Sequence, residues 1–275
     1  MGWKRKLAGV PILGRVIVFG HRLRMPFRYY RPTIKHGVRW LFKSKEFTNF
    51  TYDLEPTNRE YLACMIAVVT GRSPEDIRGY FAELENDTAL FEHIRQATKA
   101  SDDEFISDAD AKFGRRIGWY AFVRALKPKV VVETGIHKGL GSVVLTSALQ
   151  RNAAEGAPGY YYGTEIRTEY GFLLCGPYAQ YGKILYGDSI ESLKALGKPI
   201  DLFINDSDHS EEYEGREYQT VKDMLPERAV LLGDNSHCTD KLYKFAVQTG
   251  RKFLFFHEVP REHWYPGGGI GIAYR

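Results

Sequence analysis

The sequence contains only three cysteines, and their spacing fits no common disulfide or zinc-binding motif. Cys64, Cys175 and Cys238 lie far apart, and no CxxC motif is present. This number and spacing argue against a disulfide scaffold and against a structural zinc site. A reducing compartment is the simplest interpretation, so we expect a cytoplasmic protein.

Long hydrophobic runs are also lacking. No window reaches the roughly 18 uninterrupted apolar residues of a membrane span, and the best candidate, residues 9–20, is interrupted by Arg15. That stretch has no small-residue cleavage site, which argues against a signal peptide. The composition is otherwise ordinary, with 44% hydrophobic and 26% charged residues in a chain of 275. This length is enough for a full enzyme core, and the composition excludes global disorder.

Acidic residues are absent from the first 45 positions, which hold twelve lysines and arginines. The rest of the chain carries 26 basic and 34 acidic side chains, so a cationic arm precedes a mildly acidic body. Aromatic residues are interleaved with these cations, a mixture typical of an amphipathic helix on an anionic membrane surface. We therefore expect residues 1–45 to make the protein peripheral at a membrane, with nucleic acid a less favoured partner. The alternatives are a solvated arm and an arm packed on a partner subunit of a homo-oligomer.

The pattern of the body changes at Pro128. Before it, Ser73 and Asp87 each precede a run typical of a helix start, and a third helix is predicted from about Ala109 to Leu126. After it, apolar runs with the bias of buried strands follow one another. These predicted strands are Val130–Glu133, Tyr160–Glu165, Ile184–Tyr186, Leu202–Asn205, Val230–Leu232, Phe253–Phe256 and Ile270–Tyr274.

Helical segments fit between the first six predicted strands, which indicates a mostly parallel sheet covered on both faces. Only a Pro/Gly-rich loop, residues 260–269, separates the last two strands, so we expect an antiparallel pair at the sheet edge. The fold class is therefore α/β. Three parts are predicted: a basic aromatic arm at 1–50, a helical region at 51–127 and a sheet domain at 128–275.

Ligands of open parallel sheets bind beyond the carboxyl ends of the strands. Glu165 ends the second strand, where an acid can accept both hydroxyls of a ribose, and a solvated acid is the alternative. Asp188 and Ser189 follow the third strand and can line an adenine pocket or cap a helix. A glycine-rich turn follows the first strand and permits close approach of a ligand to a helix N-terminus, although such turns are often purely structural. The turn is Glu133-Thr134-Gly135-Ile136-His137-Lys138-Gly139-Leu140-Gly141-Ser142.

Acids and histidines follow the fourth and fifth strands. Asp206 and Asp234 are 28 residues apart, one strand–helix–strand passage. If their strands are neighbours, about 4.8 Å apart, the carboxylates lie close and need a cation between them. With the amide of Asn235 they form an all-oxygen set suited to Mg²⁺ or Ca²⁺, and acids that merely cap helices are the alternative. His209 and His237 are better placed as general bases than as metal ligands.

These motifs occur in the order typical of class I S-adenosylmethionine-dependent methyltransferases. The segments that carry the resemblance are residues 131–149, 163–167, 187–189, 201–213 and 231–237. Residues 128–275 most resemble the catechol and caffeoyl-CoA O-methyltransferases and their bacterial relatives that modify natural products and sugars. The resemblance implies a Rossmann-like, seven-stranded, mostly parallel sheet with an antiparallel edge strand. Residues 1–127 lie outside it.

The resemblance also implies roles for individual residues. Those that would bind S-adenosylmethionine are Glu133, Gly135, Gly139, Gly141, Ser142, Glu165, Asp188, Ser189 and Asp206. In the metal-dependent branch an Asp follows strand four and an Asp-Asn pair follows strand five, which match Asp206, Asp234 and Asn235. Asp208 is an alternative second carboxylate for the metal. A lysine often stands where this chain has His209, which leaves the base open between His209 and His237.

We therefore expect an O-methyltransferase that uses S-adenosylmethionine and acts on a hydroxyl of a small molecule or glycan, assisted by Mg²⁺ or another divalent cation. A metal-independent enzyme with a histidine base is one alternative. A non-enzymatic cofactor-binding scaffold recruited through its basic arm is another. The loop from Glu258 to Gly269, with His263, Trp264 and Tyr265, is expected to line the acceptor pocket or to plug the edge hairpin.

Overall fold

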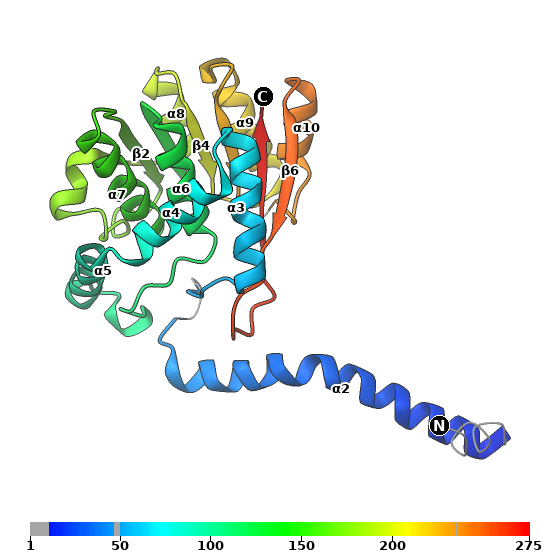
Figure 1. Cartoon of the computed structure of the whole chain (residues 1–275). Coiled ribbons are helices and arrows are strands. Elements are labelled where there is room, and N and C mark those ends of the chain that lie inside the picture. The colour runs from blue at the N-terminus through cyan, green and yellow to red at the C-terminus, as the bar shows by residue number, and fades with distance from the viewer. Residues whose placement is uncertain (1–10, 47–49, 235) are drawn as a thin grey trace. The chain divides into compact units, whose positions relative to one another are not determined.

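The computed structural model describes residues 11–46, 50–234 and 236–275 (Figure 1). These residues form two compact units. The larger unit contains Lys45–Arg261 and Gly267–Arg275. The smaller unit contains the described part of the first 44 residues and the segment Glu262–Pro266.

The larger unit is built on a seven-stranded sheet with the order β3-β2-β1-β4-β5-β7-β6. Its strands are β1 (Val130–Thr134), β2 (Tyr160–Glu165), β3 (Gly182–Tyr186), β4 (Leu202–Asn205), β5 (Val230–Gly233), β6 (Lys252–His257) and β7 (Gly269–Tyr274). The first five strands are parallel, whereas β7 runs antiparallel to both β5 and β6. The predicted mostly parallel sheet with an antiparallel pair at its edge is confirmed.

In the described chain, helices α2 to α6 precede the first strand, and helices α7 to α10 lie between strands in the sequence. They are α2 (Pro11–Lys43), α3 (Pro56–Thr70), α4 (Pro74–Glu85), α5 (Thr88–Ala100), α6 (Arg116–Leu126), α7 (Leu140–Ala154), α8 (Ser189–Leu196), α9 (Glu211–Val221) and α10 (Lys241–Gln248). Helix α9 packs between α8 and α10, and α6 packs on α7 with α3 and α4 against it (Figure 1). The sheet therefore lies between two helical layers, as expected for continuous apolar strands.

Alternating side chains of the strands supply both layers of the core. Val132 and Phe203 face Tyr218 of α9 in one buried cluster. Tyr161 of β2 points the other way, where its hydroxyl lies 2.7 Å from Ser142 Oγ of α7. The buried sheet thus holds the strand ends rigidly, and those ends carry the polar residues singled out in the sequence.

Two local predictions are confirmed and two are wrong. Ser73 caps α4 in a capping box, and the Asp87 carboxylate accepts a hydrogen bond from the Leu90 amide at the start of α5. The helix expected from Ala109 starts only at Arg116, because the preceding segment turns through Gly114 at a φ of 49°. The connection from β2 to β3 holds only a short 3-10 helix, Gly176–Tyr181, with a proline in its first turn, where an α-helix was expected.

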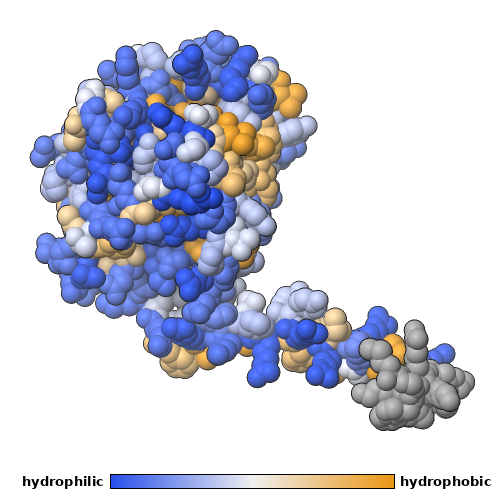
Figure 2. Space-filling view, viewed as in Figure 1, coloured by the Kyte–Doolittle hydropathy of each residue, from blue (hydrophilic) through white to orange (hydrophobic). Residues whose placement is uncertain are grey.

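The smaller unit is dominated by α2, which contains Pro26 and Pro32. Its exposed apolar side chains include Val16, Phe19, Leu23, Phe27, Tyr29, Tyr30, Ile34, Leu41 and Phe42. Figure 2 shows hydrophilic and hydrophobic residues side by side along this helix. Trp40 packs edge-on against Trp264 with ring centroids 5.2 Å apart, and Arg39 lies 3.6 Å from Glu262. Among the described residues, no helix is long and apolar enough to cross a membrane.

Candidate cofactor and acceptor site

Three neighbouring strands end side by side at the carboxyl edge of the sheet. Thr134 of β1 is in register with Asn205 of β4, and Asn205 with Gly233 of β5. The next residues continue this pairing, since the Asp206 amide donates to the Thr134 carbonyl at 2.9 Å and the Asp234 amide to the Asn205 carbonyl at 2.8 Å. Asp206 and Asp234 therefore follow neighbouring strands, which the predicted proximity of their carboxylates required.

A cavity of about 420 Å³ opens beside these strand ends. Six residues singled out in the sequence line it: Gly135, Glu165, Asp188, Ser189, Asp206 and Asp208. The cavity is also lined by residues without a predicted role, among them His137, Ile166, Tyr170 and Tyr213. Ile166 is 74% exposed, and it gives the cavity an apolar rim next to Glu165.

The Glu165 carboxylate is held by the backbone of two loops. One oxygen accepts the His137 amide at 2.9 Å and the other accepts the Arg167 amide at 3.0 Å. Each oxygen keeps a further lone pair, and the side chain borders the cavity. Glu165 thus fixes both loops while offering two acceptors to a ligand.

The turn after β1 lies against the loop after β4. Gly135 has a φ of +77°, and a Cβ atom there would lie 2.2 Å from the Asp206 carbonyl oxygen. His137 also has a positive φ of 48° and packs edge-on against Tyr170, with ring centroids 4.5 Å apart. Burial, helped by Lys138, lowers the pKa of His137 to about 4, so its ring is neutral at pH 7.

Asp188 combines the two roles considered for it. One carboxylate oxygen accepts the Glu191 amide at 3.0 Å and caps α8, and the other accepts the Tyr213 hydroxyl at 2.9 Å. The backbone hydrogen bond lowers the pKa of Asp188. Because Asp188 also borders the cavity, capping and ligand contact are compatible.

Four residues expected at the cofactor do not line the cavity: Glu133, Gly139, Gly141 and Ser142. Glu133 is buried beneath the turn, where it accepts the Tyr161 hydroxyl and lies 3.5 Å from Ser142 Oγ. Gly141 makes room for it, since a Cβ there would lie 2.1 Å from a Glu133 oxygen. Burial raises the pKa of Glu133 to about 7. In this structure Glu133, Gly141 and Ser142 hold the turn in place.

On the other side of Asp206, a cluster combines two acids and a histidine. The ligand atoms of Asp206, His209 and Asp234 all lie within 4.8 Å of one another. His209 Nε2 is 3.9 Å from Asp206 Oδ1, and the His209 side chain is 39% exposed. Two other predicted residues lie apart from this group. The Asp208 carboxylate accepts the Ser210 amide at 2.8 Å, and His237 is exposed with its Nε2 3.4 Å from Cys238 Sγ.

Asn235, which was predicted as a metal ligand, lies outside the described residues. Of the metal ligands predicted from the sequence, the structure therefore describes Asp206, Asp208 and Asp234. Of these, the structure brings Asp206 and Asp234 together and adds His209.

Arg115, which the sequence reasoning missed, reaches this cluster from the segment before α6. Its guanidinium pairs with both oxygens of Asp234, with one hydrogen bond of 2.6 Å, and it donates to the Tyr52 hydroxyl at 3.3 Å. Glu258 lies 3.8 Å from it and accepts the Tyr52 hydroxyl at 2.8 Å. Burial alone would raise the pKa of Asp234, but Arg115 holds that pKa below its ordinary value. Burial and the neighbouring Asp234 raise the pKa of Asp206.

A second missed residue, Glu217 of α9, ties the strand ends together. Its carboxylate accepts hydrogen bonds from Thr134 at 3.2 Å and Ser207 at 2.7 Å, and from Ser189 and Asn205. These donors follow or end three different strands. No local motif marks either Arg115 or Glu217, because each acts through residues distant in the sequence.

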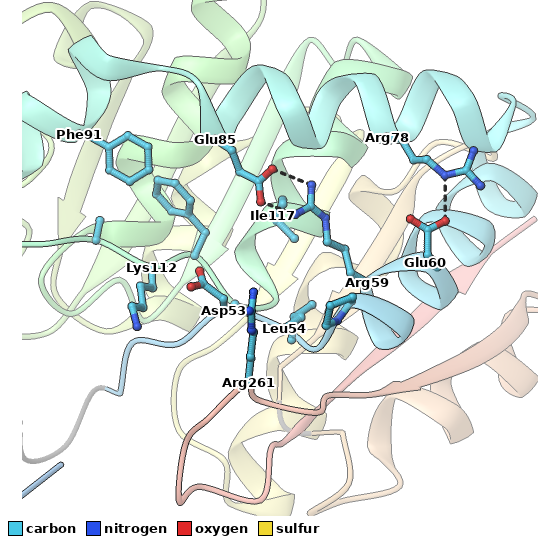
Figure 3. Close-up of a pocket in the computed structure, with 14 residues that line it drawn as sticks. Asp53, Leu54, Arg59, Glu60, Arg78, Glu85, Phe91, Lys112, Ile117 and Arg261 are labelled. Carbon is cyan, nitrogen blue, oxygen red and sulfur yellow. Dashed lines mark hydrogen bonds and ion pairs between the residues drawn. The ribbon is translucent and has the colours of Figure 1, made fainter. Parts of the chain in front are cut away.

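A second cavity of about 620 Å³ lies between α3, α4 and the segment before α6 (Figure 3). Four of its charged side chains form two ion pairs, Arg59 with Glu85 and Arg78 with Glu60. None of the residues predicted to bind the cofactor or a metal, or to act as the base, lines it. The cavity at the strand ends is therefore the candidate for the cofactor.

Comparison with known proteins identifies the fold and the kind of domain. Residues 132–236 match the family model described as a methyltransferase domain. The chain is similar in structure to an O-methyltransferase from Bacillus cereus in complex with SAH, with a TM-score of 0.53, 13% identity, and 69% of this chain and 92% of that chain covered. It is also similar to the O-methyltransferase TomG from Streptomyces achromogenes, involved in tomaymycin synthesis and in complex with SAM, with a TM-score of 0.50, 16% identity, and 69% and 90% covered. No curated protein sequence matches the chain.

The fold and the family match agree on the class of the sheet domain. Residues 132–236 are a methyltransferase domain, and the sheet domain has the Rossmann-like fold of class I methyltransferases. Within that class, the similar structures are O-methyltransferases. The predictions of the fold and of a methyltransferase enzyme are confirmed.

Proposed function

We propose that the protein transfers a methyl group from S-adenosylmethionine to a hydroxyl of a small molecule or glycan. The observation that carries this proposal is the position of Asp206. It lines the cavity that also contains Glu165, and it belongs to the cluster with His209 and Asp234. A donor in the cavity and an acceptor beside the cluster would therefore meet at one residue.

The cavity suits the adenosyl part of the cofactor. The Glu165 oxygens that remain open can accept the two ribose hydroxyls, as the corresponding acid does in dinucleotide-binding folds. The exposed face of Ile166 and the rings of Tyr170 and Tyr213 offer apolar surface to a flat base, with Asp188 at its polar edge. The methyl group would then point toward Asp206.

The chemistry needs an oxygen nucleophile in line with the methyl carbon and a base for its proton. In this proposal His209 Nε2 takes the hydroxyl proton, the oxygen bonds to the methyl carbon, and the carbon–sulfur bond breaks. Its electron pair stays on sulfur, so the sulfonium becomes a neutral thioether. The partial exposure of His209 lets it reach an acceptor, and His237 remains the alternative base.

The sequence also predicts a divalent cation at this cluster. Asp206, His209 and Asp234 are spaced to bind one, and a bound cation would lower the pKa of the acceptor hydroxyl. Arg115, however, already pairs with both oxygens of Asp234. The distances within the cluster suit a divalent cation, but the guanidinium of Arg115 already supplies a positive charge to Asp234, so the proposed reaction uses no metal.

The proposed reaction is tested by incubating the full chain with methyl-labelled S-adenosylmethionine and panels of hydroxylated metabolites and sugars. We expect a labelled product whose mass spectrum places the methyl group on oxygen. A purified, folded protein that binds no S-adenosylmethionine would contradict the proposal. Binding without transfer to any acceptor would favour the non-enzymatic scaffold.

We further propose that α2 places the enzyme peripherally on an anionic membrane surface at the cytoplasmic side. Its cations and exposed aromatic and aliphatic side chains are the two ingredients of such binding. Replacing the exposed Arg22, Arg24 and Arg28 by glutamine should weaken sedimentation with phosphatidylserine vesicles roughly 100-fold, because each cation near the surface contributes about 1 kcal/mol. Undiminished binding, or equal binding to neutral vesicles, would remove the charge-based part of this proposal. A concentration-dependent dimer would instead favour an arm packed on a partner subunit.

A further inference from the structure

A buried guanidinium occupies the side of Asp234 that a metal would need. We propose that Arg115 serves as an internal counter-cation in place of a divalent metal at Asp234. In combination with the proposed function, the enzyme would then transfer methyl groups without a metal.

The first support is the geometry of the pair. The flat guanidinium of Arg115 faces Asp234 with two nitrogens, one to each carboxylate oxygen. This fork matches a carboxylate in a way that a lysine cannot, and such charge-assisted pairs are the strongest hydrogen bonds of side chains. A metal ion at Asp234 would have to share or displace these bonds.

The second support is the way Arg115 is held. Its side chain is only 13% exposed, it donates to the Tyr52 hydroxyl, and Glu258 lies on its other side. The guanidinium also lies 5.8 Å from the Trp119 ring centroid. Moving it away would leave the buried Glu258 without its nearest cation, which is costly in a protein interior. Arg115 is therefore a fixed part of this cluster and not a mobile side chain that a metal can easily replace.

The third support is the balance of charge around Asp234. Three carboxylates, Asp206, Asp234 and Glu258, face two buried guanidinium groups, Arg115 and Arg116, of which Arg116 is 7% exposed. These acids exceed the guanidinium groups by one negative charge at most, so a divalent cation added to the same set would make it positive and would repel the positive sulfonium of the methyl donor.

Titration of the full chain with Mn²⁺, followed by electron paramagnetic resonance, tests this inference without relying on activity. The wild-type protein should bind no Mn²⁺ with a Kd below about 0.1 mM, a range that protein sites for divalent cations reach. Arg115→Met, which keeps the length of the side chain and removes the charge, should bind at least roughly tenfold more tightly. The double variant with Asp234→Asn should lose that gain. Arg115→Lys is the matched control and should resemble the wild type, since it keeps a cation beside Asp234.

Two results would overturn the inference. One is wild-type Mn²⁺ binding in the stated range that Asp234→Asn abolishes, and this measurement decides the matter even if Arg115→Met does not fold. The other is a folded Arg115→Met protein with no gain in Mn²⁺ binding. Because the readout is metal binding, a failure of the proposed methyl transfer leaves both results interpretable.

Discussion

The two halves of the strand-end edge hold their acids in different ways. On the side where we propose the cofactor, here called the cofactor side, Glu165 and Asp188 accept hydrogen bonds from backbone amides and a tyrosine hydroxyl. On the side where we propose the acceptor, here called the acceptor side, Asp234 and Glu258 face a guanidinium. Backbone amides neutralise an acid only partly and leave lone pairs for neutral hydroxyls, whereas Arg115 neutralises Asp234 directly. The cofactor side is thus built for hydrogen bonding and the acceptor side for handling charge.

The largest effect that would sharpen this comparison is expected on the acceptor side. His209→Ala should lower turnover roughly 10²–10⁴-fold, the usual contribution of a positioned acid–base group, while affinity for S-adenosylmethionine stays near wild type. Steady-state kinetics and calorimetry measure the two quantities separately. His237→Ala is the matched control, because that side chain is exposed and was not brought into the cluster. Normal turnover in folded His209→Ala with a loss in His237→Ala would reverse the assignment of the base.

A substitution at the boundary of the two halves should come next in size. Gly135→Ala places a methyl group 2.2 Å from the Asp206 carbonyl at a φ of +77°, so one of the two loops has to move. We expect a loss of roughly 3 kcal/mol or more in the free energy of unfolding, from backbone strain and overpacking together. Gly197→Ala is the control, because its φ is +58° and nothing lies within 4 Å of the added atom. It should lose only about 1–2 kcal/mol in chemical denaturation, and equal losses in both variants would contradict the close approach.

The same division explains what could be predicted from the sequence. The cofactor side is formed by short segments at strand ends, so the motifs around Gly135, Glu165 and Asp188 mark it directly. Asp206 and Asp234 could be placed together because β4 and β5 are neighbours, which follows from the order of the strands. Arg115 could not be found, since it comes from the helical region outside the family resemblance and reaches Asp234 across 119 residues.

The cofactor contacts predicted for the turn after β1 stay predictions, and the structure shows a supporting role for some of these residues. Glu133, Gly141 and Ser142 fit the motif, but they lie beneath the turn and support it. A sequence motif records that a position is constrained without distinguishing contact with a ligand from support of the backbone. The missing α-helix between β2 and β3 has a similar cause, since segment length permits a helix without requiring one.

The dependence of stability on pH should reveal the buried acid beneath the cofactor turn. The pKa of Glu133 is raised from 4.5 to about 7 by burial, so the folded state binds its proton more tightly than the unfolded state. The free energy of unfolding contributed by this group should therefore fall by roughly 3 kcal/mol as pH rises from about 4.5 to about 7. His137, with its pKa lowered to about 4, has the opposite dependence over an overlapping range. We would therefore measure the free energy of unfolding of wild type and Glu133→Gln by chemical denaturation at pH 5 and pH 8. If the difference between the two proteins is the same at both pH values, the raised pKa of Glu133 is contradicted.

The smallest effect is expected at Glu165, where the comparison between the halves is most direct. Glu165→Ala removes the acceptors proposed for the ribose hydroxyls and should weaken S-adenosylmethionine binding by about 1.5–3 kcal/mol, or roughly 10–150-fold. Glu169→Ala is a matched control, since this acid lies on the same loop, is exposed and pairs only with Arg167 among the described residues. It changes the net charge equally and should leave the affinity near wild type. Calorimetry on both variants measures the difference, and circular dichroism shows whether the loops held by Glu165 remain folded. Unchanged affinity in a folded Glu165→Ala protein would mean that this carboxylate only fixes the loops, as its two backbone hydrogen bonds already show that it does, and that the ribose is bound elsewhere in the cavity.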